Sequence, residues 1–594
     1  MKGLVYSSTF GLNFSTTAGE TYRTDRTHYL STKRGYDFEK YQPGDNQYQT
    51  SQIPHGGVLS TSNDRNKNFT FRNQIEYNKI FNEKHVLNAM AGTEMRSNKY
   101  DGLNQTTWGY LLDRGKKFTE LPPTYANGGT NPLYRTTPTV IDRISNYISY
   151  YAIMSYMFDE RYSINASIRG DASNRFGQDK SARFNPVWST GVRWNIHNEH
   201  WMKKQHIING LSLRASYGFQ GNVVEDYGPD LIAKINAPDR YGNFTMSISR
   251  LPTPGLKMEK SKTVNLGIDW ALLKNRISGT FEYYDRRTVD MIVQYPVPYE
   301  NGISSMPING GNMRNYGWDL SLGFVPIQSQ DFGLSLRFNT GKVFNTLKTR
   351  MKSTDLWSSA VGGSLNKEGY PVSSFWAFKY IGLNPVNGSP MVDLTNSDSE
   401  TAAQDITTVM KYMGKTNPDF TGGLSINFRY KSLTLSSSFY LSTGNKRFLA
   451  SPFGNTYNLP NEENSLSAEL LNRWRKPGDE LTTNMPAIPT RENNQLMYPF
   501  KTKDNDHKLY PYYAWAYSDI RVVDAWYFAC KGINLSYKLP NSWVSKYAQS
   551  VGVTFSVSDV FKMVSKDYLK RDPEVASGQQ PITSNYTFGI TASF

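Results

Sequence analysis

The chain has 594 residues, with 66 lysines and arginines against 51 aspartates and glutamates, which gives a formal net charge of +15. Only 38% of the residues are hydrophobic although 14% are aromatic, and no run approaches the roughly 20 apolar residues of a membrane helix. This composition excludes a helical membrane protein, and the single cysteine, Cys530, excludes an internal disulfide and a cysteine-based metal cage. Because the basic residues are scattered, we expect no nucleic-acid partner.

From its first residues onward, the chain alternates apolar and polar side chains. Leu4, Tyr6, Phe10, Leu12 and Phe14 share one phase, and small polar residues occupy the other. The same pattern returns in the segments 162–169, 188–196, 211–220, 264–270 and 332–339. Successive side chains of a strand point to opposite faces, so these segments are predicted strands with one apolar and one polar face.

Short and long connections alternate between the predicted strands. Short turns are expected at 82–84, 159–160, 273–275, 328–330 and 431–432. Long polar stretches occupy 20–67, 99–142, 221–259, 293–311, 347–417, 447–525 and 559–583. This alternation is typical of a membrane barrel, in which short periplasmic turns alternate with long extracellular loops. The sequence therefore predicts an all-β protein, an antiparallel transmembrane β-barrel of about 16 strands with long extracellular loops.

A series of longer motifs runs in order along the chain. They are YSINASIRGDASNRF (162–176), LRASYGFQGN (213–222), SKTVNLGIDWALLKNRISGTFEYYDRRTVDMI (261–292), NGGNMRNYGWDLSL (309–322), NRWRKPGDE (472–480), FACKGINLSYKLP (528–540) and RDPE (571–574). In this series the chain resembles the SusC/RagA-like family of TonB-linked outer-membrane transporters.

The resemblance implies a domain organisation that this chain matches only in part. Family members carry a signal peptide, a plug and a barrel, and plugged transporters of this type have 22 strands. We find no leader pattern and no plug segment, so residues 1–594 are expected to be the C-terminal part of the barrel, without about six strands. The terminal Phe594 is expected to be the barrel-assembly signal.

The resemblance also implies a function. It is TonB-dependent uptake of an oligosaccharide or a peptide in the outer membrane of a Gram-negative bacterium of the Bacteroidota type. A SusD-like surface lipoprotein would be the lid, and the TonB–ExbB–ExbD motor would act through the missing plug region. On this interpretation the chain is not an enzyme and needs no cofactor. The alternatives are a barrel scaffold or receptor that does not transport, one half of a split barrel, and a soluble all-β carbohydrate-active enzyme.

An open barrel would expose unpaired backbone groups of its edge strands to lipid. Unpaired N–H and C=O groups at a sheet edge each cost several kcal/mol in lipid. We therefore expect the chain to be unstable in a membrane as an open sheet, unless a second polypeptide supplies strands or the sheet closes into a narrower barrel.

Two groups of side chains are candidates for contact with a substrate. Aromatic residues in the long loops would stack on sugar rings, with the membrane girdle and loop packing as the alternative; they are Trp357, Trp376, Tyr512, Tyr513 and Trp515. Arginines on the polar strand faces would line the lumen and favour anions, with pairing to lumen carboxylates as the alternative; they are Arg169, Arg193, Arg214 and Arg337.

The sequence gives no convincing metal site or catalytic motif. His197 and His200 are three residues apart, but they lie at a strand end, where a solvated connection is favoured over zinc binding. Asp504, Asp506 and His507 lack the spacing and glycine of a calcium loop. Cys530 is expected to be an inert small side chain.

Overall fold

The computed structural model describes residues 3–594 apart from 125–129, 135, 178, 180–181, 183–185, 224–226, 237–240, 350–356, 400–404, 454–465, 498–507 and 577–578. One antiparallel sheet dominates it, and short β4 (Lys117–Phe118) is one of its 17 strands. The sixteen long strands are β1 (Leu4–Arg23), β2 (Gly57–Phe81), β3 (His85–Leu111), β5 (Thr139–Phe158), β6 (Tyr162–Ser173), β7 (Val187–Asn195), β8 (Ile208–Asn222), β11 (Glu259–Leu272), β12 (Ile277–Pro296), β13 (Ser305–Gln328), β14 (Phe332–Leu347), β19 (Phe420–Tyr430), β20 (Leu433–Thr443), β23 (Tyr527–Lys538), β24 (Ser550–Val564) and β25 (Asn585–Ser593).

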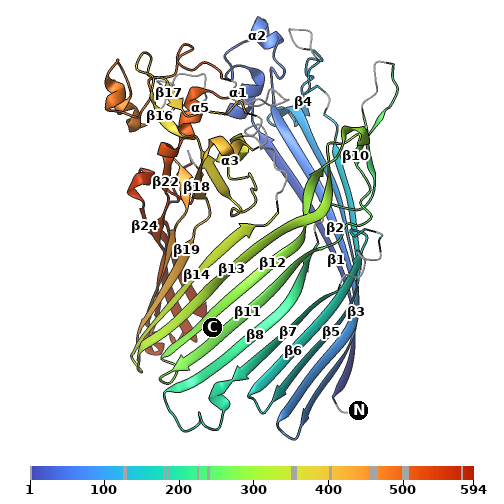
Figure 1. Cartoon of the computed structure of the whole chain (residues 1–594), viewed down its shortest axis with the longest axis vertical. Helices are drawn as coiled ribbons and strands as arrows, with labels where there is room; N and C mark the ends of the chain where they lie inside the picture. The colour runs from blue at the N-terminus through green and yellow to red at the C-terminus, as the bar shows by residue number, and fades with distance from the viewer. Residues whose placement is uncertain are drawn as a thin grey trace.

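Each long strand pairs with the long strands before and after it in the chain, so the sheet is a continuous meander. The short connections lie at one end of this curved wall, and the long loops with α1 (His28–Arg34) and α2 (Asn46–Gln49) lie at the other (Figure 1). The all-β prediction of about sixteen strands is confirmed.

All five predicted short turns join consecutive strands of the sheet. Their backbone suits a tight hairpin: Asp159 and Glu160 have φ values of 52° and 56°, and Lys431 has a φ of 50°. Left-handed turn residues match the right-handed twist of the flanking strands, which explains why polar residues that tolerate this conformation stand there.

Several strands extend further than the sequence pattern predicts. The stretches 20–67, 99–142, 293–311 and 559–583 were expected to be loops, but they include the outer ends of β2, β3, β5, β12, β13 and β24. Beyond the membrane both faces of a strand can be polar, so period-two alternation fades while the hydrogen-bonded pairing continues.

The apolar phase forms one face of the sheet and carries an aromatic row near the short turns. The rings of Phe158 and Tyr162 stack with centroids 6.5 Å apart, and Tyr162 and Trp194 stack at the same spacing. Glu199, in the connection after β7, accepts hydrogen bonds from Tyr162 Oη at 2.6 Å and Trp194 Nε1 at 2.9 Å. These bonds lower the pKa of Glu199 to about 2, so its carboxylate holds the two rings in place at all physiological pH values.

Two strands of the sheet have a neighbour on one side only. Among the described residues, β1 pairs with β2 and β25 pairs with β24, and no pairing joins β1 to β25. Apolar side chains stand exposed on both, as Phe14 at 68% and Phe588 at 66% show. The described sheet is therefore open between β1 and β25.

Two long connections fold against each other into a second layer, the loop bundle, which comprises the described parts of 348–419 and 444–526. Its elements are α3 (Trp357–Val361), β15 (Ser374–Ala377), β16 (Tyr380–Leu383), β17 (Pro390–Val392), η3 (Ile406–Val409), β18 (Lys411–Lys415), β21 (Lys446–Phe448), η4 (Ala468–Asn472), η5 (Asp479–Leu481), α5 (Pro511–Ala516), η6 (Asp519–Arg521) and β22 (Val522–Asp524). It stands over the outer ends of the late strands (Figure 1).

The remaining short elements lie in other connections. They are η1 (Ile196–Asn198), β9 (Ile232–Ile235), β10 (Met246–Arg250), η2 (Tyr299–Asn301), α6 (Asn541–Val544) and η7 (Lys566–Tyr568). In the described part of the chain, every helix is too short or too polar to be a membrane span.

Candidate functional site

Charged side chains on the polar face of the sheet form ion pairs that run from strand to strand. Arg169 on β6 bonds to Asp171 with Nε–Oδ1 at 2.8 Å and reaches Glu94 on β3 at 3.5 Å. Glu94 is 8% exposed and also pairs with Arg72 of β2. The three strands β2, β3 and β6 are thus linked through one carboxylate across the polar face.

A second cluster continues this pattern. Asp269 of β11 lies between two guanidinium groups, with Arg193 Nη2 at 3.3 Å and Arg214 Nη2 at 3.1 Å. Arg214 also pairs with Glu282 of β12. It lies flat over Gly267, where an added Cβ would stand 2.5 Å from its Nε. A side chain at position 267 would therefore require the Arg214 side chain to shift.

Most of the predicted lumen arginines take part in these ion pairs. Arg169, Arg193 and Arg214 pair with carboxylates, which fits the pairing alternative, while Arg337 on β14 is exposed and has no carboxylate partner among the described residues. In a membrane barrel the polar face lines the lumen, and this wall is close to neutral where the clusters lie.

Three of the five candidate stacking residues are core residues of the loop bundle. Trp376, Tyr512 and Trp515 are 2%, 3% and 1% exposed. Their faces are covered by neighbouring side chains, so they stabilise the bundle and offer no surface to a ligand. Loop packing, the alternative weighed for them, fits their burial.

Trp357 and Tyr513 are placed differently. Both are partly buried at the edge of the same core, with ring centroids 6.3 Å apart. They are brought together with part of their surface free, and stacking on a ligand by this pair stays a proposal.

A buried arginine joins the two ends of the second loop. The side chain of Arg521 is 6% exposed, and its Nη1 lies 2.6 Å from Glu469 Oε2. Its Nη2 donates to the carbonyl of Ala450 at 2.8 Å, and its guanidinium lies 4.6 Å from the centre of the Trp515 ring. Glu469 also lies 3.6 Å from Arg571, so the charge cluster extends to the connection after β24.

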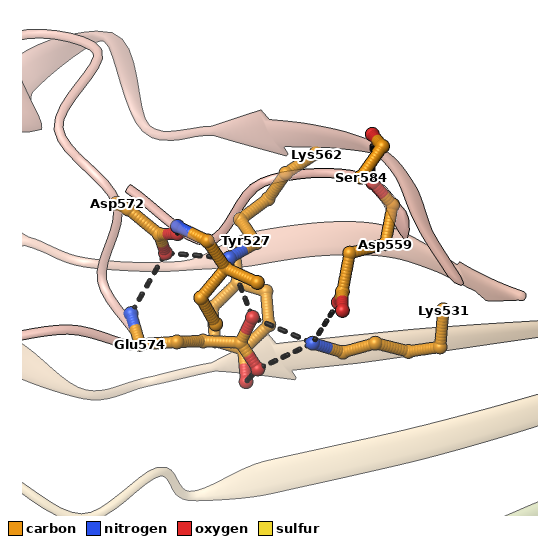
Figure 2. A network of polar contacts seen from close by, with 8 residues as sticks. Tyr527, Lys531, Asp559, Lys562, Asp572, Glu574 and Ser584 are labelled. Carbon is orange, nitrogen blue, oxygen red and sulfur yellow. Dashed lines mark hydrogen bonds and ion pairs between the residues drawn. The ribbon is translucent and has the colours of Figure 1, made fainter. Parts of the chain in front are cut away.

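The RDPE motif connects that last loop to the wall (Figure 2). Glu574 Oε2 lies 2.6 Å from Lys531 Nζ and 2.5 Å from Lys562 Nζ, and Asp572 Oδ1 lies 2.5 Å from Lys562 Nζ. Lys531 stands at a bulge where the register of β23 against β24 shifts. We call Lys531, Lys562, Asp572 and Glu574 the clasp.

We expect Glu574→Gln to loosen the clasp. Burial opposes ionisation of Glu574, but hydrogen bonds from Lys531 and Lys562 outweigh it and lower its pKa. A hydrogen bond to a charged group contributes about 1.5 kcal/mol or more to stability. Its loss should raise the population of the opened segment, so trypsin should cut at Lys566, Lys570 and Arg571 about tenfold faster. Gln579→Ala, on an exposed residue further along the same connection and away from the cleavage sites, should leave the cleavage rate unchanged.

The clasp should also weaken in acid. The folded-state pKa of Glu574 lies below the ordinary 4.5, so its stabilising contribution is complete above 4.5 and is lost as the pH falls through the lower folded value. Hydrogen exchange of residues 565–576, corrected for the intrinsic rate, should rise over that interval in the wild type and rise less in Glu574→Gln, where only Asp572 of the clasp still titrates.

The other predicted residues take simple positions. His197 Nδ1 contacts the carbonyl of Leu211 at 3.1 Å, and no group of three potential metal ligands occurs in the part of the chain that the structure describes. Asp504, Asp506 and His507 lie outside the described residues. Cys530 is buried beside the bulge, and Phe594 is 86% exposed directly after β25.

The family model described as "TonB dependent receptor-like, beta-barrel" matches residues 2–475. The chain belongs to this family. TonB-dependent receptors act in the outer membrane, and the similar proteins are receptors and transporters, not enzymes, so the predictions of family, fold class and absence of enzyme activity are confirmed.

Individual proteins similar to this chain are also TonB-dependent receptors. TonB-dependent receptor P3 of Formosa agariphila is 25% identical over 545 residues, which is 87% of this chain and 50% of that protein. TonB-dependent receptor SusC of Bacteroides thetaiotaomicron is 26% identical over 476 residues, 75% of this chain and 44% of SusC. The chain spans about half the length of the curated relatives it matches.

A solved structure shows the same fold. The structure of the RagAB peptide transporter superposes with a TM-score of 0.76 at 22% identity, over 100% of this chain and 60% of that one. The likeness covers all the long strands and the loop bundle.

Sequence reasoning missed a pocket between the β1–β2 connection and the outer end of β3. The sequence signal for it is a high density of tyrosine and arginine in residues 22–55, within the polar stretch 20–67.

Proposed function

We propose that this chain supplies most of the barrel wall of a TonB-dependent outer-membrane importer for an oligosaccharide or a peptide. The observation that carries the proposal is the combination of a sixteen-strand wall, ion pairs along its polar face and a packed extracellular loop bundle, in a chain of the TonB-dependent receptor family. A rigid outer layer over a polar lumen suits capture of a polar solute on the outside of the cell.

The partners belong to the same proposal. A SusD-like surface lipoprotein would close over the loop bundle, and the TonB–ExbB–ExbD motor would act through a plug that residues 1–594 do not include. The relatives SusC and the RagAB transporter support this pairing. Outer-membrane lipid would cover the apolar face of the wall.

The open edges extend the proposal to the barrel itself. β1 and β25 would each gain a strand partner from the strands that complete a barrel of the 22-strand type, in the same polypeptide or in a second one. Closure removes the unpaired backbone groups that lipid does not tolerate.

Growth of a deletion strain tests the transport function. A strain without this receptor should lose growth on at least one member of a panel of defined oligosaccharides and peptides as sole carbon source, and a strain without TonB should lose growth on the same compound. Growth that depends on the receptor but not on TonB would overturn energy-coupled import in favour of a passive receptor or scaffold.

A further inference from the structure

A pocket of about 880 Å³ lies between the β1–β2 connection, which contains α1 and α2, and the outer end of β3. These two helices lie at the loop end of the sheet (Figure 1). The volume lies within the roughly 300–1,000 Å³ typical of ligand pockets. We call it the β1–β2 pocket.

One cation in the wall of this pocket is buried without a counter-charge. Arg34, the last residue of α1, is 4% exposed, and its Nη2 donates to the carbonyl of Asp25 at 2.8 Å. Its Nε and Nη1 have no hydrogen-bond partner, and no carboxylate of the described residues pairs with it. A buried guanidinium is costly unless it is paired, and none of the carboxylates that line the pocket is an ion-pair partner of Arg34.

The position of Arg34 is fixed by the local fold. Gly35, with a φ of 90°, ends α1, and the hydroxyl of Ser51 donates to the carbonyl of Arg34 at 2.9 Å. Leu30 and Ile53, both 0% exposed, pack beneath the same loop. The guanidinium is therefore held in place before any ligand arrives.

Aromatic rings and a second arginine surround this cation. The guanidinium of Arg26 lies 4.9 Å from the centre of the Phe38 ring, and that of Arg34 lies 5.7 Å from the same centre. Tyr36 and Tyr41 meet edge to face at 5.0 Å. Flat rings of this kind cover the C–H faces of sugar rings.

The polar groups of the pocket discriminate between ligand classes. His55, which also lines it, has an Nε2 atom with no partner. Asp25, Glu39 and Asp113 line the same pocket and accept hydrogen bonds only. A sugar supplies hydroxyl donors to these carboxylates and a uronic acid adds the anion for Arg34, whereas the side chains of an acidic peptide supply carboxylates without hydroxyl donors.

We propose that the β1–β2 pocket binds an acidic oligosaccharide, with a uronate carboxylate paired to Arg34 and the sugar ring against the aromatic side chains. This proposal rests on the proposed uptake function, because an importer of saccharides would need a saccharide site at the outer end of its barrel.

Calorimetry on the complete receptor in detergent tests the proposal with tetragalacturonate as the probe and maltotetraose as its uncharged counterpart. The wild type should bind tetragalacturonate and not maltotetraose. Arg34→Gln should raise the Kd for tetragalacturonate about 10- to 100-fold, because it removes a charged hydrogen-bonding partner. Arg491→Gln, on an exposed residue of the loop bundle, should leave the Kd unchanged.

A second variant protects the test against loss of folding. Arg26 is exposed, so Arg26→Gln leaves the buried contacts of α1 intact and should raise the same Kd about threefold through the lost cation–π and charge interactions. Equal affinity of the wild type for maltotetraose, tighter binding of tetraglutamate, or an unchanged Kd in both arginine variants would overturn the acidic-saccharide site. Because binding in detergent needs neither TonB nor growth, its failure would leave the import proposal standing, and the reverse also holds.

Discussion

Residues 1–594 expressed by themselves are expected to give no heat-modifiable species in outer-membrane fractions. A closed barrel resists SDS until it is boiled, and the described sheet is open between β1 and β25. About half of the residues in each edge strand direct their N–H and C=O groups away from the only neighbour.

The size of the effect follows from the number of such groups. A strand crosses the hydrocarbon with about 10 residues, so each edge leaves roughly ten unpaired groups there at several kcal/mol each. That sum, of the order of tens of kcal/mol, exceeds the 5–15 kcal/mol by which folded domains are usually stable. An open sheet of this kind cannot persist in lipid.

Electrophoresis of boiled and unboiled membranes measures this directly. Co-expression of a polypeptide that supplies strands for both edges should restore a band that migrates differently before boiling. A stable, heat-modifiable monomer formed by residues 1–594 alone would show that the sheet closes into a narrower barrel without further strands.

The second large effect is expected from Trp515→Ala in the complete receptor. The indole is 1% exposed, donates from Nε1 to the carbonyl of Asn484 at 3.0 Å and packs on Phe453 at 5.7 Å between ring centres. Truncating a buried tryptophan costs about 3–5 kcal/mol. We expect trypsin to cut the 466–497 segment more than a hundredfold faster, while heat-modifiability of the barrel is retained.

Trp357→Ala separates packing from ligand contact. Trp357 is only partly buried, and its ring lies 5.9 Å from Phe378 at the edge of the core. Its loss should destabilise the bundle by about 1–2 kcal/mol. If the stacking proposal for Trp357 and Tyr513 holds, the same variant weakens substrate binding beyond this effect; cleavage as fast as in Trp515→Ala would instead assign Trp357 to the core.

The sequence was a good guide wherever the membrane imposes a period. The wall segments 162–169 and 211–220 lie in β6 and β8, and the turn at 159–160 has the left-handed backbone that its polar residues favour. Because lipid lies on one side of the wall and water on the other, successive residues of a strand must alternate between apolar and polar side chains.

The loops carry no such signal, because their cores are assembled from distant parts of the chain. The Phe378 amide donates to the Tyr517 carbonyl at 3.0 Å across 139 positions, and this pairing helps to bury Trp376 and Trp515. Aromatic residues in a polar stretch look the same in sequence whether they face a ligand or a core. For the same reason, Arg34 could not be recognised as a buried cation.

The unequal strand lengths have a consequence for where a solute is first held. β3 has 27 residues and β7 has 9. At about 3.3 Å per residue and a tilt near 45°, β3 spans roughly 60 Å along the barrel axis, about 30 Å more than the hydrocarbon core, while β7 spans only about 20 Å. The outer rim of the wall, formed by the strand ends on the loop side, is therefore higher at β3 than at β7. At its high side Tyr110 and Leu111 end β3 beside the β1–β2 pocket. With the proposed saccharide site there, one unit of a long polymer would be bound while the rest of that polymer stays clear of the lipid headgroups.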